Sequence, residues 1–142
     1  MQCECCGRKE SELPCQFAPI QQHHLIPLLA VARWSWLSSE RYKPENIVSV
    51  CSYHRYSQSA DHPSGCHQIL ERRAKELIKQ AISEEDIAIL DIEARWSHLP
   101  NAYDPVIIDA AEEEERKVRH TVADRLVIKL RESATALTKV VY

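Results

Sequence analysis

The sequence predicts a small α+β protein, with a turn-rich N-terminal part over residues 1–66 and an α-helical extension over residues 67–142. Both glycines and five of the seven prolines lie in the first part, and such residues punctuate short elements and turns. In the second part, apolar residues recur every three or four positions, which is typical of helices packed on one face. The length of 142 residues suits one domain with an appendage and a modest core.

The N-terminal part is expected to contain two short strands and one helix. Residues 16–22 form a strand pattern interrupted by Pro19, and residues 47–50 form a strand that leads into Cys51. Residues 28–37 are expected to be helical, with two tryptophans near the end that are more typical of core packing than of base stacking.

The extension is expected to form about three helices. The first has an apolar stripe from Ile69 to Ile82. The second opens at Ser83-Glu84-Glu85-Asp86, which resembles a capping box. Its expected apolar face consists of Ile87, Leu90, Ala94 and Trp96.

The third helix is expected over residues 105–132, because Val118, Val122, Leu126 and Leu130 follow one another at steps of four. Acidic residues 112–115 are expected to form a solvated face near its start. The apolar tail over residues 136–142 is expected to dock, either as a strand or as the end of this helix.

The charge balance excludes a strongly basic protein. The formal net charge is −3; residues 1–66 carry six basic and six acidic side chains, so the excess of acid lies in the extension. Any contact with nucleic acid must then depend on a local patch of basic side chains and on a metal ion. No signal-peptide pattern and no apolar run near the ~20 residues of a membrane span is present, so we expect a cytoplasmic protein that contacts no membrane.

Cysteines and histidines cluster near the N-terminus at metal-ligand spacing. Cys3-x-x-Cys6 and Cys51-x-x-His54 each supply two ligands across two residues, as a tetrahedral structural zinc site requires. Gly7 suits the tight turn after Cys6. The competing interpretation is that these cysteines are buried thiols. Further thiols are available: Cys5 could replace one of these ligands, Cys15 and Cys66 are expected to be bystanders, and Cys66 becomes a fourth ligand if His54 is used elsewhere.

The adjacent pair His23–His24 is the candidate for chemistry. Neighbouring residues at the end of a strand point to opposite faces, so one imidazole can hold a metal while the other meets a substrate. Cleavage of a phosphodiester needs a base for water and a cation near the phosphate. Histidine suits the base role near neutral pH, although a histidine pair by itself is more often an ordinary surface or core feature.

The pattern over residues 3–55 resembles the zinc-knuckle variant of the HNH, or ββα-metal, nuclease family. The resemblance rests on Cys-x-x-Cys, on His-His before an aliphatic-aliphatic-proline run, and on Asn46 five residues before Cys51. It implies a treble-clef-like ββα-metal fold, with His23 as a ligand of the catalytic metal and His24 as the general base. It also implies that Asn46 orients the loop and the base. In the same way, it implies that Cys3, Cys6, Cys51 and His54 are the structural zinc ligands.

One position departs from the family pattern. Arg55 stands where a histidine or asparagine usually completes the catalytic metal shell, and arginine cannot bind a cation. Four explanations stay open: His54 reaches the catalytic metal, His62 or His67 supplies the ligand, Arg55 grips the phosphate instead, or the site is inert. Taken singly, His62 is more typical of a turn, and His67 of a first helical turn.

The resemblance implies a metal-dependent DNA endonuclease of the phage or mobile-element type, in a bacterial or phage-infected cell. Its cofactors would be structural Zn²⁺ and a catalytic divalent ion such as Mg²⁺, Mn²⁺ or Ni²⁺. Its substrate would be duplex or branched DNA, and residues 68–142 would provide a homodimer or protein-partner surface. One alternative is a zinc-stabilised adaptor without activity. The other is a binding domain in which all Cys and His residues serve two structural zinc ions.

Overall fold

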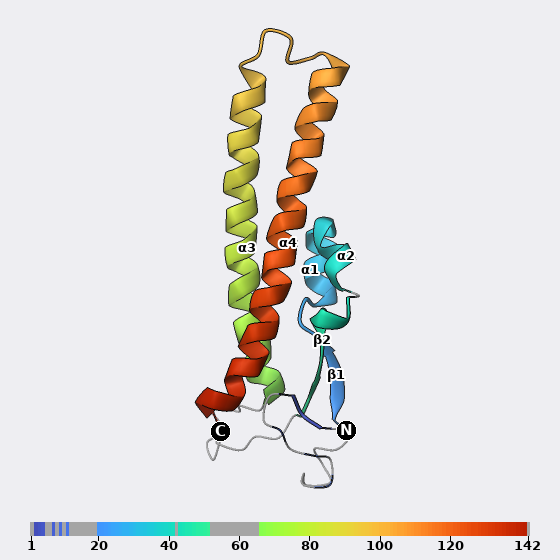
Figure 1. Cartoon of the computed structure of the whole chain (residues 1–142), viewed down its shortest axis with the longest axis vertical. Coiled ribbons are helices and arrows are strands. Elements are labelled where there is room, and N and C mark those ends of the chain that lie inside the picture. Colours follow the sequence, from blue (N-terminus) through green and yellow to red (C-terminus); the bar gives the residue numbers. More distant parts are fainter. Residues whose placement is uncertain are drawn as a thin grey trace.

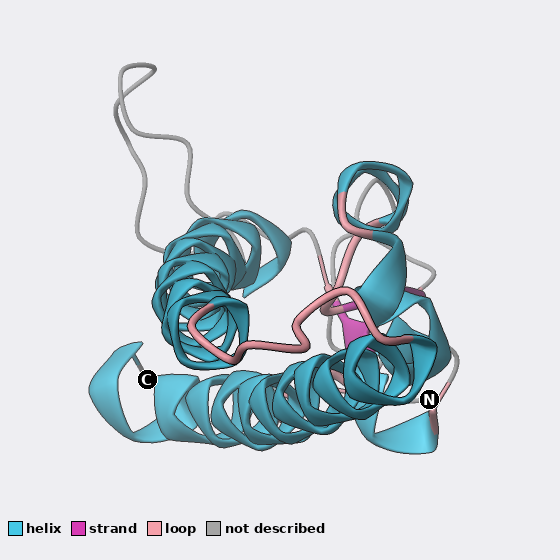
Figure 2. Cartoon of the chain, turned by 90° about the horizontal axis from the view of Figure 1, so that it is seen from above, coloured by secondary structure: helices cyan, strands magenta, loops and turns pink. Residues whose placement is uncertain are grey.

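A computed structural model of the chain describes residues 2–4, 7, 9, 11, 20–41, 43–51 and 66–141, the last seven of them and residue 41 by their backbone. Two long helices run side by side, and a small lobe of strands and short helices lies beside their lower halves (Figure 1). The view from above shows the lobe gathered at one side of the helical pair (Figure 2). The predicted α+β class is confirmed, since a two-stranded antiparallel sheet accompanies a mostly helical chain.

The described elements follow one another in the order strand, short helices, strand, long helices. They are β1 (Gln21–His24), α1 (Leu28–Arg33), η3 (Ser35–Leu37), α2 (Ser38–Arg41), η4 (Pro44–Asn46), β2 (Ile47–Val50), α3 (Cys66–Ser97) and α4 (Pro105–Val141).

The two strands pair antiparallel, with His23 opposite Val48 and His24 opposite Ile47. The strand predicted over residues 47–50 is confirmed as β2, whose Val48 and Val50 are buried while the alternate residues are half-buried. This alternation is the period of a strand with one face on the core. The strand predicted over residues 16–22 overlaps β1 only at its end, and residues 12–19 lie outside the described part of the chain.

The helix predicted over residues 28–37 is interrupted at Trp34. There the backbone leaves the helical region, at φ −129° and ψ 83°, and a 3-10 turn follows. This break directs Leu37 into the core, where it is fully buried. Trp34 and Trp36 pack against the same core, as the sequence predicted.

The prediction of about three helices in the extension is wrong, because the structure has two. α3 is 32 residues long and continues through Ser83-Glu84-Glu85-Asp86, which was expected to start a new helix. No glycine or proline lies between residues 66 and 99. Glu85 is buried and accepts a hydrogen bond at 2.9 Å from Arg119 Nε on α4, so this residue serves the helix pair and not a cap.

The apolar face expected for the second helix is also corrected. Ile87 and Leu90 are exposed, at 69% and 65%, because buried Glu85 and Ile92 occupy the side that faces α4. Trp96 alone of that set is half-buried, and its Nε1 donates to Glu114 Oε2 at 2.6 Å.

α4 begins at Pro105 as predicted but continues past residue 132 to Val141, so the tail is the end of a helix. Asp104 Oδ1 accepts a hydrogen bond at 2.9 Å from the N–H of Val106, and an aspartate before a proline is a favourable helix start. Val122, Leu126 and Leu130 are buried at the predicted steps of four. The expectation of a merely solvated acidic face is corrected, since Glu113, Glu114 and Glu115 each pair with an arginine.

The lower half of α4 holds the N-terminal lobe in place. Arg131 donates to the carbonyl of Ile47 at 3.0 Å and to Glu4 at 2.7 Å. Glu4 in turn accepts from the N–H of Ser49. One hydrophobic cluster runs from the strands through α1 into both long helices. α4 therefore anchors the segment that carries Cys3 beside β2.

Candidate metal centre and histidine pair

Cys3, Cys51 and Cys66 meet at one buried point between the N-terminal segment, the end of β2 and the start of α3. Their sulfur atoms all lie within 4.8 Å of one another, and all three side chains are buried. No disulfide joins them. Three thiolates at this separation could hold a metal ion such as zinc, which favours sulfur ligands in tetrahedral array.

One hydrogen bond shapes the turn after Cys3, and a second joins Cys51 to the Cys3 sulfur. The carbonyl of Cys3 accepts from the N–H of Gly7 at 2.9 Å, and Gly7 has a positive φ of 76°, which costs glycine little. The N–H of Cys51 donates to Cys3 Sγ at 3.4 Å. Such a donor stabilises the thiolate form that a metal requires.

Cys66 brings a third thiol to the two expected ligands Cys3 and Cys51. Cys66 was expected to be a bystander unless His54 was used elsewhere. It is instead the first residue of α3, and the carbonyl of Cys51 accepts from the N–H of His67 at 3.2 Å. This bond draws the helix start to the end of β2, and a helix N-terminus favours an anionic ligand. Cys6 and His54, the other expected zinc ligands, lie outside the described residues.

His23 and His67 face each other beside this cluster. Their ring centroids are 4.5 Å apart and their planes meet at 71°, an edge-to-face contact. His23 comes from β1 and His67 from the first turn of α3. His67 was predicted as an ordinary first-turn residue with metal binding as the alternative; it lies in that turn, and its ring is within reach of His23.

The surroundings of His23 favour its neutral form by lowering its pKa. Burial lowers the pKa of His23 below 6.5, and the nearby imidazoles of His67 and His24 act in the same direction, whereas Glu71 opposes them. A neutral imidazole has a lone pair available for a metal ion.

Glu71 was not singled out from the sequence. It lies four residues after His67 on α3, and side chains at that spacing share one helix face. The spacing His67-x-x-x-Glu71 could have revealed it, because His67 was expected in the first turn of this helix.

Asn46 fixes the loop that follows the histidine pair. Its side chain is fully buried, and its Oδ1 accepts a hydrogen bond from the N–H of Ile26 at 2.9 Å. Its backbone carbonyl accepts from the N–H of Leu25 at 2.8 Å. Asn46 therefore determines how the chain leaves β1 directly after His24. The other expected site residues, Arg55 and His62, lie outside the described part of the chain.

A second group of possible ligands is already neutralised by a lysine. Ligand atoms of Glu40, His120 and Asp124 lie within 4.8 Å of one another. Lys43 Nζ, however, is 2.8 Å from Glu40 and 3.3 Å from Asp124. The hydrogen bond to Glu40 raises the pKa of Lys43, and Asp124 adds to the effect. A fixed ammonium in this position disfavours a metal ion.

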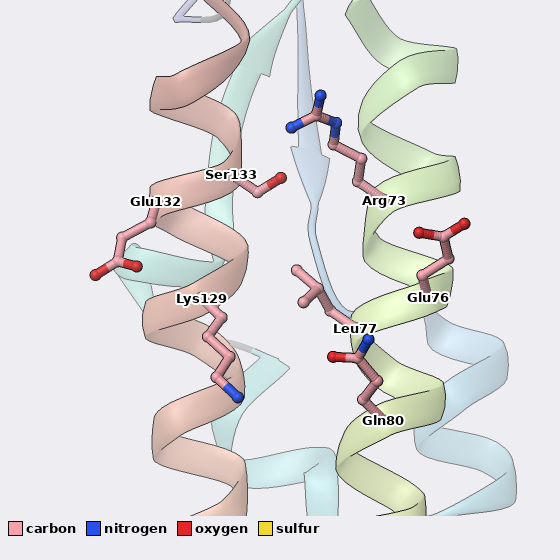
Figure 3. Close-up of a pocket in the computed structure, with 7 residues that line it drawn as sticks. All are labelled: Arg73, Glu76, Leu77, Gln80, Lys129, Glu132 and Ser133. Atoms are coloured by element: carbon pink, nitrogen blue, oxygen red, sulfur yellow. The ribbon is translucent and has the colours of Figure 1, made fainter.

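A groove of about 580 Å³ lies between α3 and α4 and shares no residue with either group. Its walls carry Arg73 and Gln80 on α3 and Lys129 and Ser133 on α4, with Leu77 between them (Figure 3). It has no cysteine or histidine, and its two cations are accompanied by two glutamates. We assign no chemistry to this groove.

Comparison of the chain with protein-family models, with curated proteins and with solved structures found no match. Among the described helices, none combines the length and the apolar character that a membrane crossing requires.

Proposed function

We propose that this chain is a metal-dependent endonuclease of the HNH type that hydrolyses phosphodiester bonds in DNA. The observation that supports the proposal best is the contact between His23 and His67, with ring centroids 4.5 Å apart. It joins β1 to the start of α3, so the order β1, β2, α3 suits the ββα-metal arrangement.

The donor types of three residues would suit a divalent ion, although their ligand atoms do not form a group within 4.8 Å of one another in the structure. Two imidazoles, His23 and His67, with the carboxylate of Glu71 one turn further along α3, offer donor types that Mn²⁺, Ni²⁺ and Mg²⁺ accept. Such an ion, when bound, supplies positive charge for the non-bridging and leaving oxygens of the phosphate. In this assignment, His67 takes the place that Arg55 cannot fill, and Arg55 contacts phosphate.

His24 would act as the general base. It follows His23 directly in β1, so the two side chains point to opposite faces of the strand. His24 would take a proton from the attacking water, and a positioned base contributes about 10²–10⁴-fold to rate. Asn46 would keep His24 in position through the loop bonds to Leu25 and Ile26.

Cys3, Cys51 and Cys66 would hold structural zinc, with Cys6 of the Cys3-x-x-Cys6 knuckle as the candidate fourth ligand. This role links the two sites, because Cys66 and His67 are adjacent. A metal that fixes Cys66 to the end of β2 also fixes His67 against His23. Zinc and thiolates of this kind suit the reducing interior of a bacterial or phage-infected cell.

The second candidate is a zinc-stabilised adaptor without activity. It is favoured by the net charge of −3, since sequence-independent contact with DNA depends on basic groups. In this case, the cysteine cluster stabilises the fold and the long helices bind a protein.

The test is nicking of supercoiled plasmid by purified, zinc-loaded protein with Mg²⁺, Mn²⁺ or Ni²⁺. We expect cleavage by the wild type and by the control His98→Ala, whose side chain is exposed in the turn directly after α3. The cleavage rate of His24→Ala should fall by about 10²-fold or more. The cleavage rate of His67→Ala should increase less than that of the wild type when metal is added. Zinc content should be the same in all four proteins. Absence of cleavage with every ion, in protein that keeps its zinc, would overturn the nuclease proposal and favour the adaptor.

A further inference from the structure

The charge of α3 changes sign along its length. Residues 66–82 carry four basic and two acidic side chains, whereas residues 83–97 carry five acidic side chains and one basic. The first stretch lies at the height of the N-terminal lobe, and the second extends above it (Figure 1). The helix is therefore positive at one end and negative at the other.

Four charged residues on α3 repeat at intervals of seven. They are Arg72, Lys79, Asp86 and Glu93, and all four are exposed. Seven residues are close to two helical turns, so these side chains lie in one row along the helix. In sequence order, the row reads positive, positive, negative, negative.

Exposed apolar side chains accompany this row. Leu90 lies between Asp86 and Glu93, and Ile87 follows Asp86 directly; they are 65% and 69% exposed. Glu85 and Ile92, on the side toward α4, are buried, so Ile87 and Leu90 face away from α4. Two large apolar residues in the middle of an acidic stretch make a surface that gains from being covered.

We propose that a second copy of this chain docks antiparallel on this row of α3. A two-fold axis between Ile82 and Ser83 places Arg72 opposite Glu93 of the partner subunit and Lys79 opposite Asp86 of the partner subunit, and each pair occurs twice. In the same register, Leu90 lies against the aliphatic stem of Lys75 of the partner subunit.

The other arrangements of two copies are disfavoured by charge. A parallel pair places Asp86 against Asp86 and Glu93 against Glu93. An antiparallel pair that meets through its two acidic ends places Asp86 against Glu93, which again brings like charges together. Like charges at an interface are repulsive, and opposite charges fix register. The antiparallel pair centred between Ile82 and Ser83 alone matches every charge of the row. This inference does not rest on the proposed nuclease activity.

The test is sedimentation velocity over a concentration series at low and high salt. We expect a dimer that weakens with salt, since exposed pairs are screened. Arg72→Glu and Glu93→Arg should each raise the dimer Kd by on the order of tenfold or more, because each reversal disturbs two symmetric pairs. The double variant Arg72→Glu with Glu93→Arg should recover an affinity within about threefold of the wild type.

The matched control is Glu112→Arg, the same charge reversal at an exposed site on α4, which should leave the Kd unchanged. Circular dichroism confirms that each variant keeps its helices. Carbodiimide treatment of a mixture of labelled and unlabelled protein should join Lys79 to Asp86 between chains.

Either of two results would overturn the proposal: a wild type that stays monomeric throughout, or a double variant no better than the single ones. If Arg72→Glu and Lys79→Glu abolish binding to duplex DNA in a monomeric protein, the row is a nucleic-acid surface and the self-association is refuted.

Discussion

The side-chain oxygen of Asn46 accepts a hydrogen bond from the backbone N–H of Ile26 at 2.9 Å, and both residues are fully buried. Asn46→Ala leaves that N–H without its partner in a site closed to water. Loss of one partner of a buried hydrogen bond costs about 1–3 kcal/mol. Urea unfolding should show this loss in Asn46→Ala.

The control is Asn101→Ala, an exposed residue of the turn between α3 and α4, which should change stability little. If Asn46→Ala is as stable as Asn101→Ala, the loop after His24 does not depend on the Asn46 side chain.

Zinc retention tests the place of Cys66 in the buried cluster. Cys66→Ser removes one of three sulfur atoms that lie within 4.8 Å of one another. Loss of an outer-shell partner of a metal ligand costs about 10–100-fold in affinity, so loss of a ligand should cost at least as much. We expect one tightly held zinc per wild-type chain, measured by elemental analysis after dialysis against a chelator, and little zinc in Cys66→Ser.

Cys15→Ser is the matched control, because Cys15 is expected to be a bystander. Equal zinc in Cys66→Ser and wild type would exclude Cys66 as a ligand. A lower unfolding temperature without zinc is expected as well, since metal binding contributes folding free energy.

The contribution of His23 to stability should depend on pH in one direction. Burial lowers the pKa of His23 in the folded chain below 6.5, so the unfolded chain binds a proton more readily. The stability that neutral His23 provides is present above pH 6.5 and is lost as the pH falls through the folded-state pKa. His23→Gln cannot titrate, and it should lose less stability than the wild type between about pH 7 and pH 5.

Acid also releases metal from thiolates, but this loss occurs in the wild type and in His23→Gln alike. The quantity to follow with pH is therefore the difference between the unfolding free energies of these two proteins. His98→Gln serves as an exposed control and should follow the wild type. A His23→Gln variant with the same acid response as the wild type would show that His23 is not buried in its neutral form.

Sequence patterns over a few neighbouring residues predicted the elements that depend mainly on those neighbours. The strand predicted over residues 47–50 is β2, with alternating burial, and the helix predicted from Pro105 by its apolar steps of four begins there. Cys3 and Cys51 were chosen from spacing, and they lie in the same cluster. Each of these features is encoded within a few residues.

Features that depend on distant contacts were not predictable in the same way. Cys66 joins the cluster because the N–H of His67 bonds to the carbonyl of Cys51, and the spacing of these residues does not reveal that approach. The contact of His23 with His67 also depends on this approach of the start of α3 to the end of β2. Ser83-Glu84-Glu85-Asp86 fits a helix start and a helix interior equally well. The position of Arg119 on α4, 34 residues from Glu85, decides between the two.

The pair Glu85–Arg119 should therefore be the contact that keeps α3 continuous and joined to α4. Arg119 Nε donates to the buried carboxylate of Glu85 at 2.9 Å, and the arginine is 35% exposed. Glu85→Ala should cost roughly 1.5–3 kcal/mol, the range for hydrogen bonds to charged groups, when measured by urea unfolding. Glu84→Ala, whose carboxylate is 44% exposed and lies 3.8 Å from Lys129, should cost less than about 1 kcal/mol. Replacing both partners by leucine should recover much of the loss, because well-packed apolar residues often substitute for a buried ion pair without penalty. If Glu85→Ala and Glu84→Ala prove equally mild, the helices are joined by their apolar contacts alone.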